Sequence, residues 1–121
     1  MSGPADLFRA LETMPTLPPG CGLQLVADGY SDPHLKLGEF AVVDRTDTAP
    51  QHGELYLIQW ESGWRAIVQA RSTKINWCEG GVGVGWYVGD LQPERLAVDG
   101  PYRTDHLKSK LVGRIVGVFS P

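Results

Sequence analysis

The stretch DGYSDPHLKLGEFAVVD, residues 28–44, determines the fold that this sequence predicts. Its first part is rich in turn-forming residues, from Asp28 to Pro33, and its second part is the apolar run Phe40–Val43, which Asp44 ends. Turn residues followed by a short run with β-branched residues predict a loop that leads into a buried strand. Loops held by a buried strand commonly position binding and catalytic residues, so this loop is the first candidate site.

Short strands separated by turns are predicted on both sides of this stretch. The 15 glycines and 9 prolines among 121 residues favour many turns over long helices. Runs rich in apolar, β-branched and aromatic residues predict strands at 23–26, 40–43, 55–60, 64–70 and 111–119. Five side chains are expected to be among the most buried: Val42, Leu57, Ile67, Ile115 and Val118. The sequence therefore predicts a mainly β domain.

Two segments have less regular patterns. The glycine-rich segment 77–86 lacks the following Gly-Lys-Ser/Thr of a phosphate-binding loop, so it predicts a glycine-rich hairpin or a bulged loop. The two flanking residues, Trp77 and Trp86, are expected in the core or in cross-strand pairs, with surface anchoring as the alternative. Segment 91–104 is expected to be irregular because it contains two prolines and a glycine.

The amino-terminal residues predict a short helix. Apolar residues recur at helical spacing over residues 4–14 (Leu7, Phe8, Leu11, Met14), and Pro15 cannot continue the pattern. We therefore expect a helix and a proline-rich linker over residues 1–20, followed by a β domain over residues 21–121. Twenty residues are too few for a helix-turn-helix in front of that domain.

Composition excludes several classes of function. A net charge of −3 gives no basic footprint for direct nucleic-acid binding. The longest apolar runs are far shorter than the roughly 20 residues that cross a bilayer, and no secretory signal is visible, so we expect a cytoplasmic protein that does not enter a membrane. Cys21 and Cys78 lack a CxxC partner, and the three histidines are scattered (His34, His52, His106). We therefore expect free thiols, no metal site and no cofactor.

The stretch 28–44 resembles the active-site segment of the LexA, UmuD and phage-repressor serine peptidases, which share a fold with signal peptidases. In that family a Gly-Asp-Ser-Met-x-Pro loop is followed by Leu, then Gly-Asp, then a β-run that ends in Asp. Seven residues fit this pattern without a gap: Pro33, Leu35, Gly38, Glu39, Val42, Val43 and Asp44. The closing segment 111–119 is similar to the Val-Ile-Gly-Arg-Val-Val-Gly-Val ending of the same fold. The resemblance covers about residues 23–71 and 107–119 and implies a LexA/signal-peptidase-like (β-clip-like) domain.

The catalytic pair of that family is missing when its residues are carried over one by one. Counting back from Pro33, the nucleophilic serine falls on Tyr30, its neighbouring methionine falls on Ser31, and the general-base lysine falls on Gln69. A phenol is bulky and poorly placed for acyl transfer, and an amide cannot accept the proton. The resemblance therefore implies a remnant site at which Tyr30 and Gln69 lie close together and Arg71 contributes to binding.

The expected function is that of a LexA-like pseudoenzyme, a dimerisation or protein-interaction module that acts as a homodimer or with a protein partner. The family context is transcription regulation and mobile-element or phage biology. One alternative is an active serine peptidase in which a one-residue deletion in the loop makes Ser31 the nucleophile, with Lys36 or Lys74 as base and Cys21-Gly22 as the candidate self-cleavage dipeptide. Another alternative is a peptide or small-ligand sensor that uses the remnant cleft.

Overall fold

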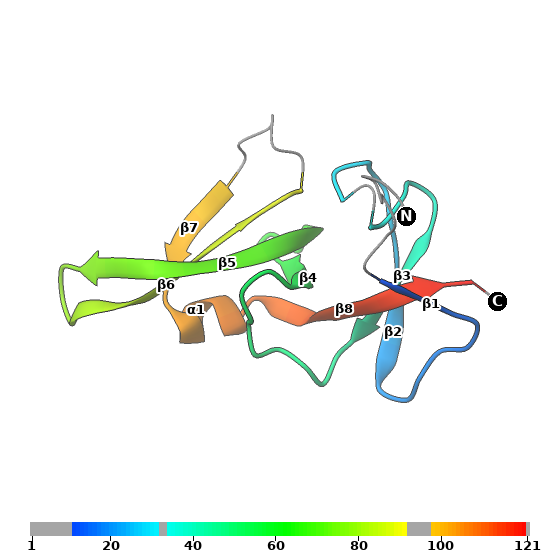
Figure 1. Ribbon diagram of the computed structural model, residues 1–121, viewed down its shortest axis with the longest axis horizontal. Coiled ribbons are helices and arrows are strands. Elements are labelled where there is room, and N and C mark those ends of the chain that lie inside the picture. Colours follow the sequence, from blue (N-terminus) through cyan, green and yellow to red (C-terminus); the bar gives the residue numbers. More distant parts are fainter. Residues whose placement is uncertain (1–10, 32–33, 92–97, 121) are drawn as a thin grey trace, which may run out of the picture.

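Strands make up nearly all of the regular structure, as the sequence predicts. The computed structural model describes residues 11–31, 34–91 and 98–120 (Figure 1). The strands are β1 (Glu12–Met14), β2 (Cys21–Leu25), β3 (Phe40–Asp44), β4 (Leu55–Gln59), β5 (Arg65–Trp77), β6 (Gly81–Gly89), β7 (Val98–Tyr102) and β8 (Leu111–Phe119), and the helix α1 spans Thr104–Lys108.

The sheet is organised around β8. Its strand order is β2-β3-β8-β4-β5-β6-β7, and every one of these pairings is antiparallel. One edge of β8 pairs with β3, while its other edge pairs with β4 near Leu111 and with β1 near Phe119. Close approach on both edges needs glycine in β8: a Cβ on Gly113 would collide with the carbonyl of Asp44, and one on Gly117 would lie 2.9 Å from the sulfur of Met14.

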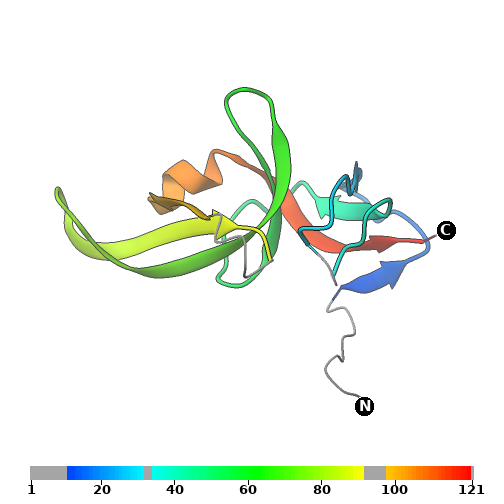
Figure 2. The ribbon, with the colours of Figure 1, turned by 90° about the horizontal axis from the view of Figure 1, so that it is seen from above.

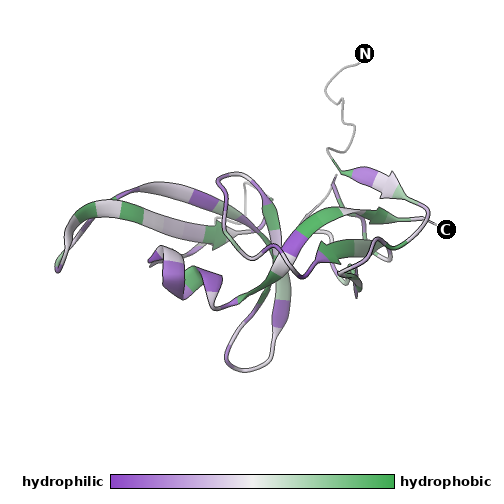
Figure 3. Ribbon diagram, turned by 90° about the horizontal axis from the view of Figure 1, so that it is seen from below, coloured by the Kyte–Doolittle hydropathy of each residue, from purple (hydrophilic) through white to green (hydrophobic). Residues whose placement is uncertain are grey.

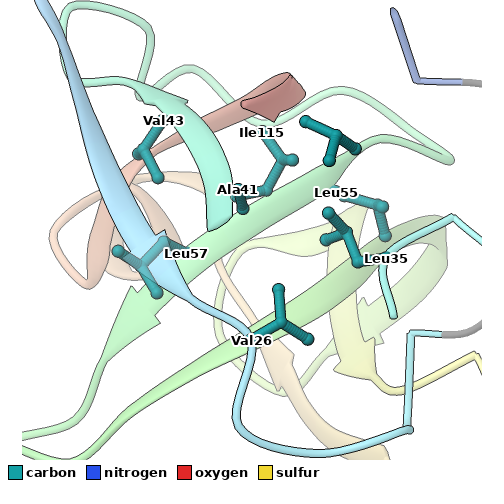
Figure 4. Packing of buried hydrophobic residues seen from close by; sticks show 8 residues of the cluster. Val26, Leu35, Ala41, Val43, Leu55, Leu57 and Ile115 are labelled. Atoms are coloured by element: carbon teal, nitrogen blue, oxygen red, sulfur yellow. The ribbon is translucent and has the colours of Figure 1, made fainter. Parts of the chain in front are cut away.

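The short strand β4 separates two hydrophobic cores. Successive strand side chains point to opposite faces, and four consecutive residues of β4 are buried. Leu55 and Leu57 belong to the first core, whose other buried members are Val26, Leu35, Ala41, Val43, Ile115 and Val118 (Figure 4). Tyr56 and Ile58 belong to the second core, with Val68, Ala70, Trp86, Val88, Leu107 and Leu111. In Figure 3 the strands at the centre of the molecule carry green segments between pale and purple ones, and the short helix α1 alternates between purple and green.

The burial expectations are confirmed at four of the five positions. Val42, Leu57, Ile115 and Val118 are buried, and Ile67 is half-buried against the first core. The predicted strands 23–26, 40–43, 55–60, 64–70 and 111–119 correspond to β2, β3, β4, β5 and β8.

The glycine-rich segment forms one arm of a long hairpin. β5 and β6 pair from Gln69 to Trp77, and the hairpin extends away from the rest of the sheet (Figure 2). The turn uses Gly80 and Gly81, both with positive φ. Within β6, a Cβ on Gly85 would collide with Ile75 of the facing strand. The glycines therefore allow bulky side chains of β5 to lie across β6, and the hairpin prediction for this segment is confirmed.

The predicted amino-terminal helix is wrong where the structure describes it. Residues 12–14 form β1, which pairs in parallel with Gly117–Phe119. The residues 4–10 of that prediction lie outside the described part of the chain. Helical spacing is a weak local preference, and pairing with an open edge of β8 overrides it here. Consequently residues 12–14 belong to the sheet and not to a separate linker.

Segment 91–104, predicted to be irregular, contains β7 and the start of α1. Gly100 has φ 134°, and a Cβ there would lie 2.5 Å from the carbonyl oxygen of Trp86. The register between β6 and β7 shifts at this point, between Trp86 and Val88. The glycine that signals a turn in the sequence thus permits an irregular strand, because β6 supplies the hydrogen-bonding partner.

Candidate functional site

The first half of β5 has one open edge. β5 pairs with β4 from Arg65 to Gln69, but its pairing with β6 begins only at Gln69. The amide of Ala70 donates to the carbonyl of Glu54 (3.0 Å), and the carbonyl of Trp64 accepts from Trp60 (2.8 Å). Since backbone groups alternate in direction along a strand, those of Arg65 and Ile67 point away from β4. Among the described residues, no strand pairs with them there.

The end of β2 lies opposite this open edge. A small cavity of about 50 Å³ is lined by residues 24–28 on one side and by residues 65–67 on the other, with Leu57 of the first core and Ser31 also in its wall. Val26 is hydrogen-bonded through both of its backbone groups to Gly38 and Glu39, which directly precede β3, so the backbone groups of Leu23 and Leu25 point outward from β2. The sheet thus curves so that its outer strand β2 approaches β5 without a described strand between them.

A larger pocket of about 410 Å³ adjoins this cavity. The two share Asp28, Arg65, Ala66 and Ile67 in their walls. The larger pocket is also lined by aromatic and acidic side chains, namely Tyr30, Trp60, Trp64, Asp90 and Asp99. We call it the aromatic–acidic pocket. Its volume lies within the range typical of ligand sites, and it opens directly onto the unpaired edge of β5.

Tyr30 and Ser31 are held by the loop at different depths. Tyr30 is 39% exposed and lines the aromatic–acidic pocket, and its backbone amide donates to the carboxylate of Asp28 (3.0 Å). Ser31 is 3% exposed in the wall of the small cavity, and its carbonyl accepts from the amide of Leu35 (3.1 Å). The loop therefore presents Tyr30 to solvent and turns Ser31 inward.

Gln69 is hydrogen-bonded to Arg71 and lines a third pocket. The side-chain amide of Gln69 donates a hydrogen bond to the carbonyl of Gly53 (3.1 Å). Its side-chain oxygen accepts two hydrogen bonds from Arg71, one from Nε (2.9 Å) and one from an Nη (2.7 Å). Gln69 lines a polar pocket of about 320 Å³, and Tyr30 is not among the residues of that pocket. The structure thus brings two of the three predicted binding residues together and places Tyr30 at a different pocket.

The polar pocket is dominated by an ion-pair network around Arg114. The Nε of Arg114 lies 2.7 Å from a carboxylate oxygen of Asp47, and an Nη lies 3.4 Å from Glu54. The hydrogen bond to Asp47 is the main reason why the pKa of Arg114 is raised. The guanidinium therefore stays charged and holds the loop 47–54 against β8.

The other predicted chemistry-bearing residues are dispersed. Neither Lys36 nor Lys74 lines the cavity that contains Ser31, whose charged described wall residues are Asp28 and Arg65. Cys21 and Cys78 are free thiols, and burial is the main cause of the raised pKa of Cys21. Over residues 11–31, 34–91 and 98–120, no three His, Cys, Asp or Glu side chains are grouped to hold a metal ion. No helix in those ranges has the length and apolar character needed to span a membrane.

Apart from Tyr30, the sequence interpretation missed the aromatic and acidic residues that line the aromatic–acidic pocket. Trp60 and Trp64 bracket the β4–β5 turn, and this pairing of two large aromatics around a tight turn was a usable signal. Asp99 had no comparable signal, because it is distant in sequence from the other pocket residues. Of the two tryptophans that the sequence singled out, Trp86 is buried and donates its indole N–H to Thr104 (2.8 Å). Trp77 has the guanidinium of Arg103 4.3 Å from its ring centre.

No family model, curated protein or solved structure matches this chain.

Proposed function

We propose that the chain is a non-catalytic, LexA-like interaction domain that binds an extended segment of a protein along the open edge of β5. The observation on which this proposal rests is that no described strand pairs with the backbone of Arg65 and Ile67 on the side away from β4, where two pockets adjoin. Unpaired strand edges can accept a further strand, with main-chain hydrogen bonds providing affinity and neighbouring pockets providing specificity. The small cavity and the aromatic–acidic pocket would supply such side-chain contacts.

The arrangement of the expected catalytic positions supports binding over hydrolysis. A Ser-Lys dyad needs a hydroxyl next to a lysine that can become neutral. The resemblance puts Gln69 at the position of the base, and both ends of the Gln69 amide are hydrogen-bonded to protein groups. The wall around the buried Ser31 contains no lysine among the described residues. The alternative nucleophile therefore lacks a base in its own cavity.

A backbone substitution tests the edge directly. Peptides selected from a random display library would be measured for affinity against the wild type, Arg65→Ala and Arg65→Pro. Proline removes the outward-pointing N–H, whereas alanine removes the side chain and keeps the N–H, so the pair separates the two contributions. We expect Arg65→Pro to bind roughly 3- to 10-fold more weakly than Arg65→Ala, which corresponds to one backbone hydrogen bond.

Equal affinities for the two variants would contradict strand addition. A second measurement uses the wild type alone, so that it does not depend on the stability of the proline variant. Hydrogen exchange of the wild type should slow at the amides of Arg65 and Ile67 when peptide is added, because those amides become hydrogen-bonded. Unchanged exchange at both amides with peptide bound elsewhere would also reject the proposal.

The absence of hydrolysis is tested on the unmodified protein. Self-cleavage by a Ser-Lys dyad is promoted at alkaline pH, because the lysine must lose its proton before the serine attacks. We expect prolonged alkaline incubation to leave one intact mass, and a fluorophosphonate probe to leave Ser31 unlabelled. Fragments that disappear in Ser31→Ala would establish the peptidase alternative instead.

Dimerisation is a second candidate function, favoured by the outer strand β2. Its outward-facing edge has no charged residue or proline, the devices that usually protect such edges. Leu23, Leu25 and the neighbouring Phe40 are 40%, 49% and 43% exposed. Two copies could pair antiparallel through β2 about a two-fold axis, which requires only one self-complementary strand. Sedimentation should then show a dimer for the wild type and a monomer for Leu23→Lys; a wild-type monomer at high concentration would reject this candidate.

A further inference from the structure

The aromatic–acidic pocket combines two kinds of wall. Trp60 directly follows β4 and Trp64 directly precedes β5, and the two are joined by the hydrogen bond from the Trp60 amide to the Trp64 carbonyl. Trp64 is 69% exposed, which is unusual for the largest apolar side chain. Asp28 and Asp99 approach the same pocket from the candidate loop and from β7. The pocket therefore brings together indole rings and carboxylates from three separate parts of the chain.

Neither Asp28 nor Asp99 forms an ion pair with a cation among the described residues. Asp28 accepts a hydrogen bond from the backbone amide of Tyr30, and Asp99 accepts one from the hydroxyl of Tyr102. Both donors are neutral. The cation in the described wall is Arg65, and its Nε donates to the side-chain oxygen of Gln59 at 2.7 Å. An incoming cation would thus meet two carboxylates that have no ion-pair partner among the described residues. The cations near it would be Arg65 in the same wall and Lys110, whose Nζ lies 5.7 Å from the centre of the Trp60 ring.

We propose that the aromatic–acidic pocket binds the cationic side chain of a lysine or arginine. Indole faces attract a cation through the ring quadrupole, and carboxylates add charge-assisted hydrogen bonds. An acidic side chain would be repelled by the same carboxylates, so the pocket discriminates by charge. The pocket shares Arg65 and Ile67 with the open edge of β5, so the cation would come from the segment bound there. In this form the inference rests on the proposed function and names the class of its partner: an extended segment with a basic residue.

Peptides that differ at one position test the inference. The best binder from the random library would be synthesised with lysine, norleucine or glutamate at the position that faces the pocket. We expect the lysine peptide to bind roughly 5- to 30-fold more tightly than the norleucine peptide, from cation–π and carboxylate contacts together, and the glutamate peptide to bind most weakly. The difference in affinity between the lysine and norleucine peptides should become smaller in Asp28→Asn and Asp99→Asn, because each amide keeps a hydrogen-bond acceptor and loses the negative charge. The matched control is Asp105→Asn, an exposed residue of α1, in which the difference should remain.

A second measurement separates failure of the pocket from failure of the strand edge. Tetramethylammonium would be titrated into the protein, with the neutral tert-butyl alcohol as its control, while NMR follows the indole N–H signals of Trp60 and Trp64. Saturable shifts with the cation alone, weakened in Asp28→Asn and Asp99→Asn, support the pocket even if no peptide binds β5. Lysine and norleucine peptides that bind equally well leave the strand edge intact and overturn the pocket. The absence of any shift with tetramethylammonium overturns it as well.

Discussion

The two cores on either side of β4 differ in chemistry. The first core consists of aliphatic side chains, with Leu55 and Leu57 as the contribution of β4. The second core also contains Tyr56 and Trp86, whose polar atoms are hydrogen-bonded. The Tyr56 hydroxyl donates to the carbonyl of Ala49 (3.0 Å) and accepts from the amide of Gln51 (2.8 Å). The first core therefore depends on packing volume, while the second also depends on hydrogen bonds that fix the neighbouring loop.

The largest effect is expected from truncation in the aliphatic core. Leu57→Ala should lower the free energy of unfolding by about 2–5 kcal/mol, because it leaves a cavity next to the small one at the β2–β5 junction. Urea unfolding would measure the change. Leu37→Ala is the control, since Leu37 is 68% exposed and its truncation should be nearly neutral. Equal losses in the two variants would show that β4 does not face a packed core.

A smaller effect is expected from removing one oxygen in the second core. Tyr56→Phe keeps the ring but leaves the Gln51 amide and the Ala49 carbonyl without their partner, so we expect a loss of about 1–3 kcal/mol. Tyr87→Phe is the matched control, because the Tyr87 hydroxyl has no hydrogen bond to any described residue. If both variants unfold at the same urea concentration, the second core depends on volume alone, and the contrast between the cores disappears.

The smallest effect is a difference in alkaline pH dependence at the edge of the second core. Burial, followed by the hydrogen bond and the charge of Asp99, raises the pKa of Tyr102 to about 12. Its unfolded pKa is about 10, so the neutral phenol stabilises the fold below that pH, and this contribution is lost as the pH rises from about 10 to about 12. Urea unfolding across this range should show a shallower decline for Tyr102→Phe than for the wild type. If the free energy of unfolding declines equally with pH in the wild type and in Tyr102→Phe, the raised pKa of Tyr102 is contradicted.

Much of the sheet could be predicted because strands that are buried on both faces appear in the sequence as short, nearly continuous apolar runs. β3, β4 and β8 are short runs dominated by apolar residues with β-branched members, and such runs form strands almost wherever they are packed. β1 and β7 could not be predicted in this way. The three residues of β1 become a strand because β8 offers them an edge, and β7 tolerates Gly100 because β6 pairs with it.

The candidate site was predicted only in part for a related reason. The loop 28–31 was identified from its turn residues, and the structure places both Tyr30 and Ser31 at pockets. The position of Gln69 could not be read in the same way, because the side of β5 on which it lies depends on its pairing with both β4 and β6. Its bonds to Gly53 and Arg71 direct it to the polar pocket.

The sequence by itself determined the mainly β character of the chain, the turn-forming character of its glycine-rich segment and four of the five side chains that it predicted to be most buried. These properties follow from the period of apolar residues and from turn chemistry, which act within a few residues. Only the tertiary structure decided that, in the described part of the chain, no strand pairs with the second edge of β5 at Arg65 and Ile67, because β6 pairs with β5 only from Gln69 onward. The convergence of Asp28, Trp64 and Asp99 on one pocket is likewise tertiary, since folding brings together side chains that no local pattern connects.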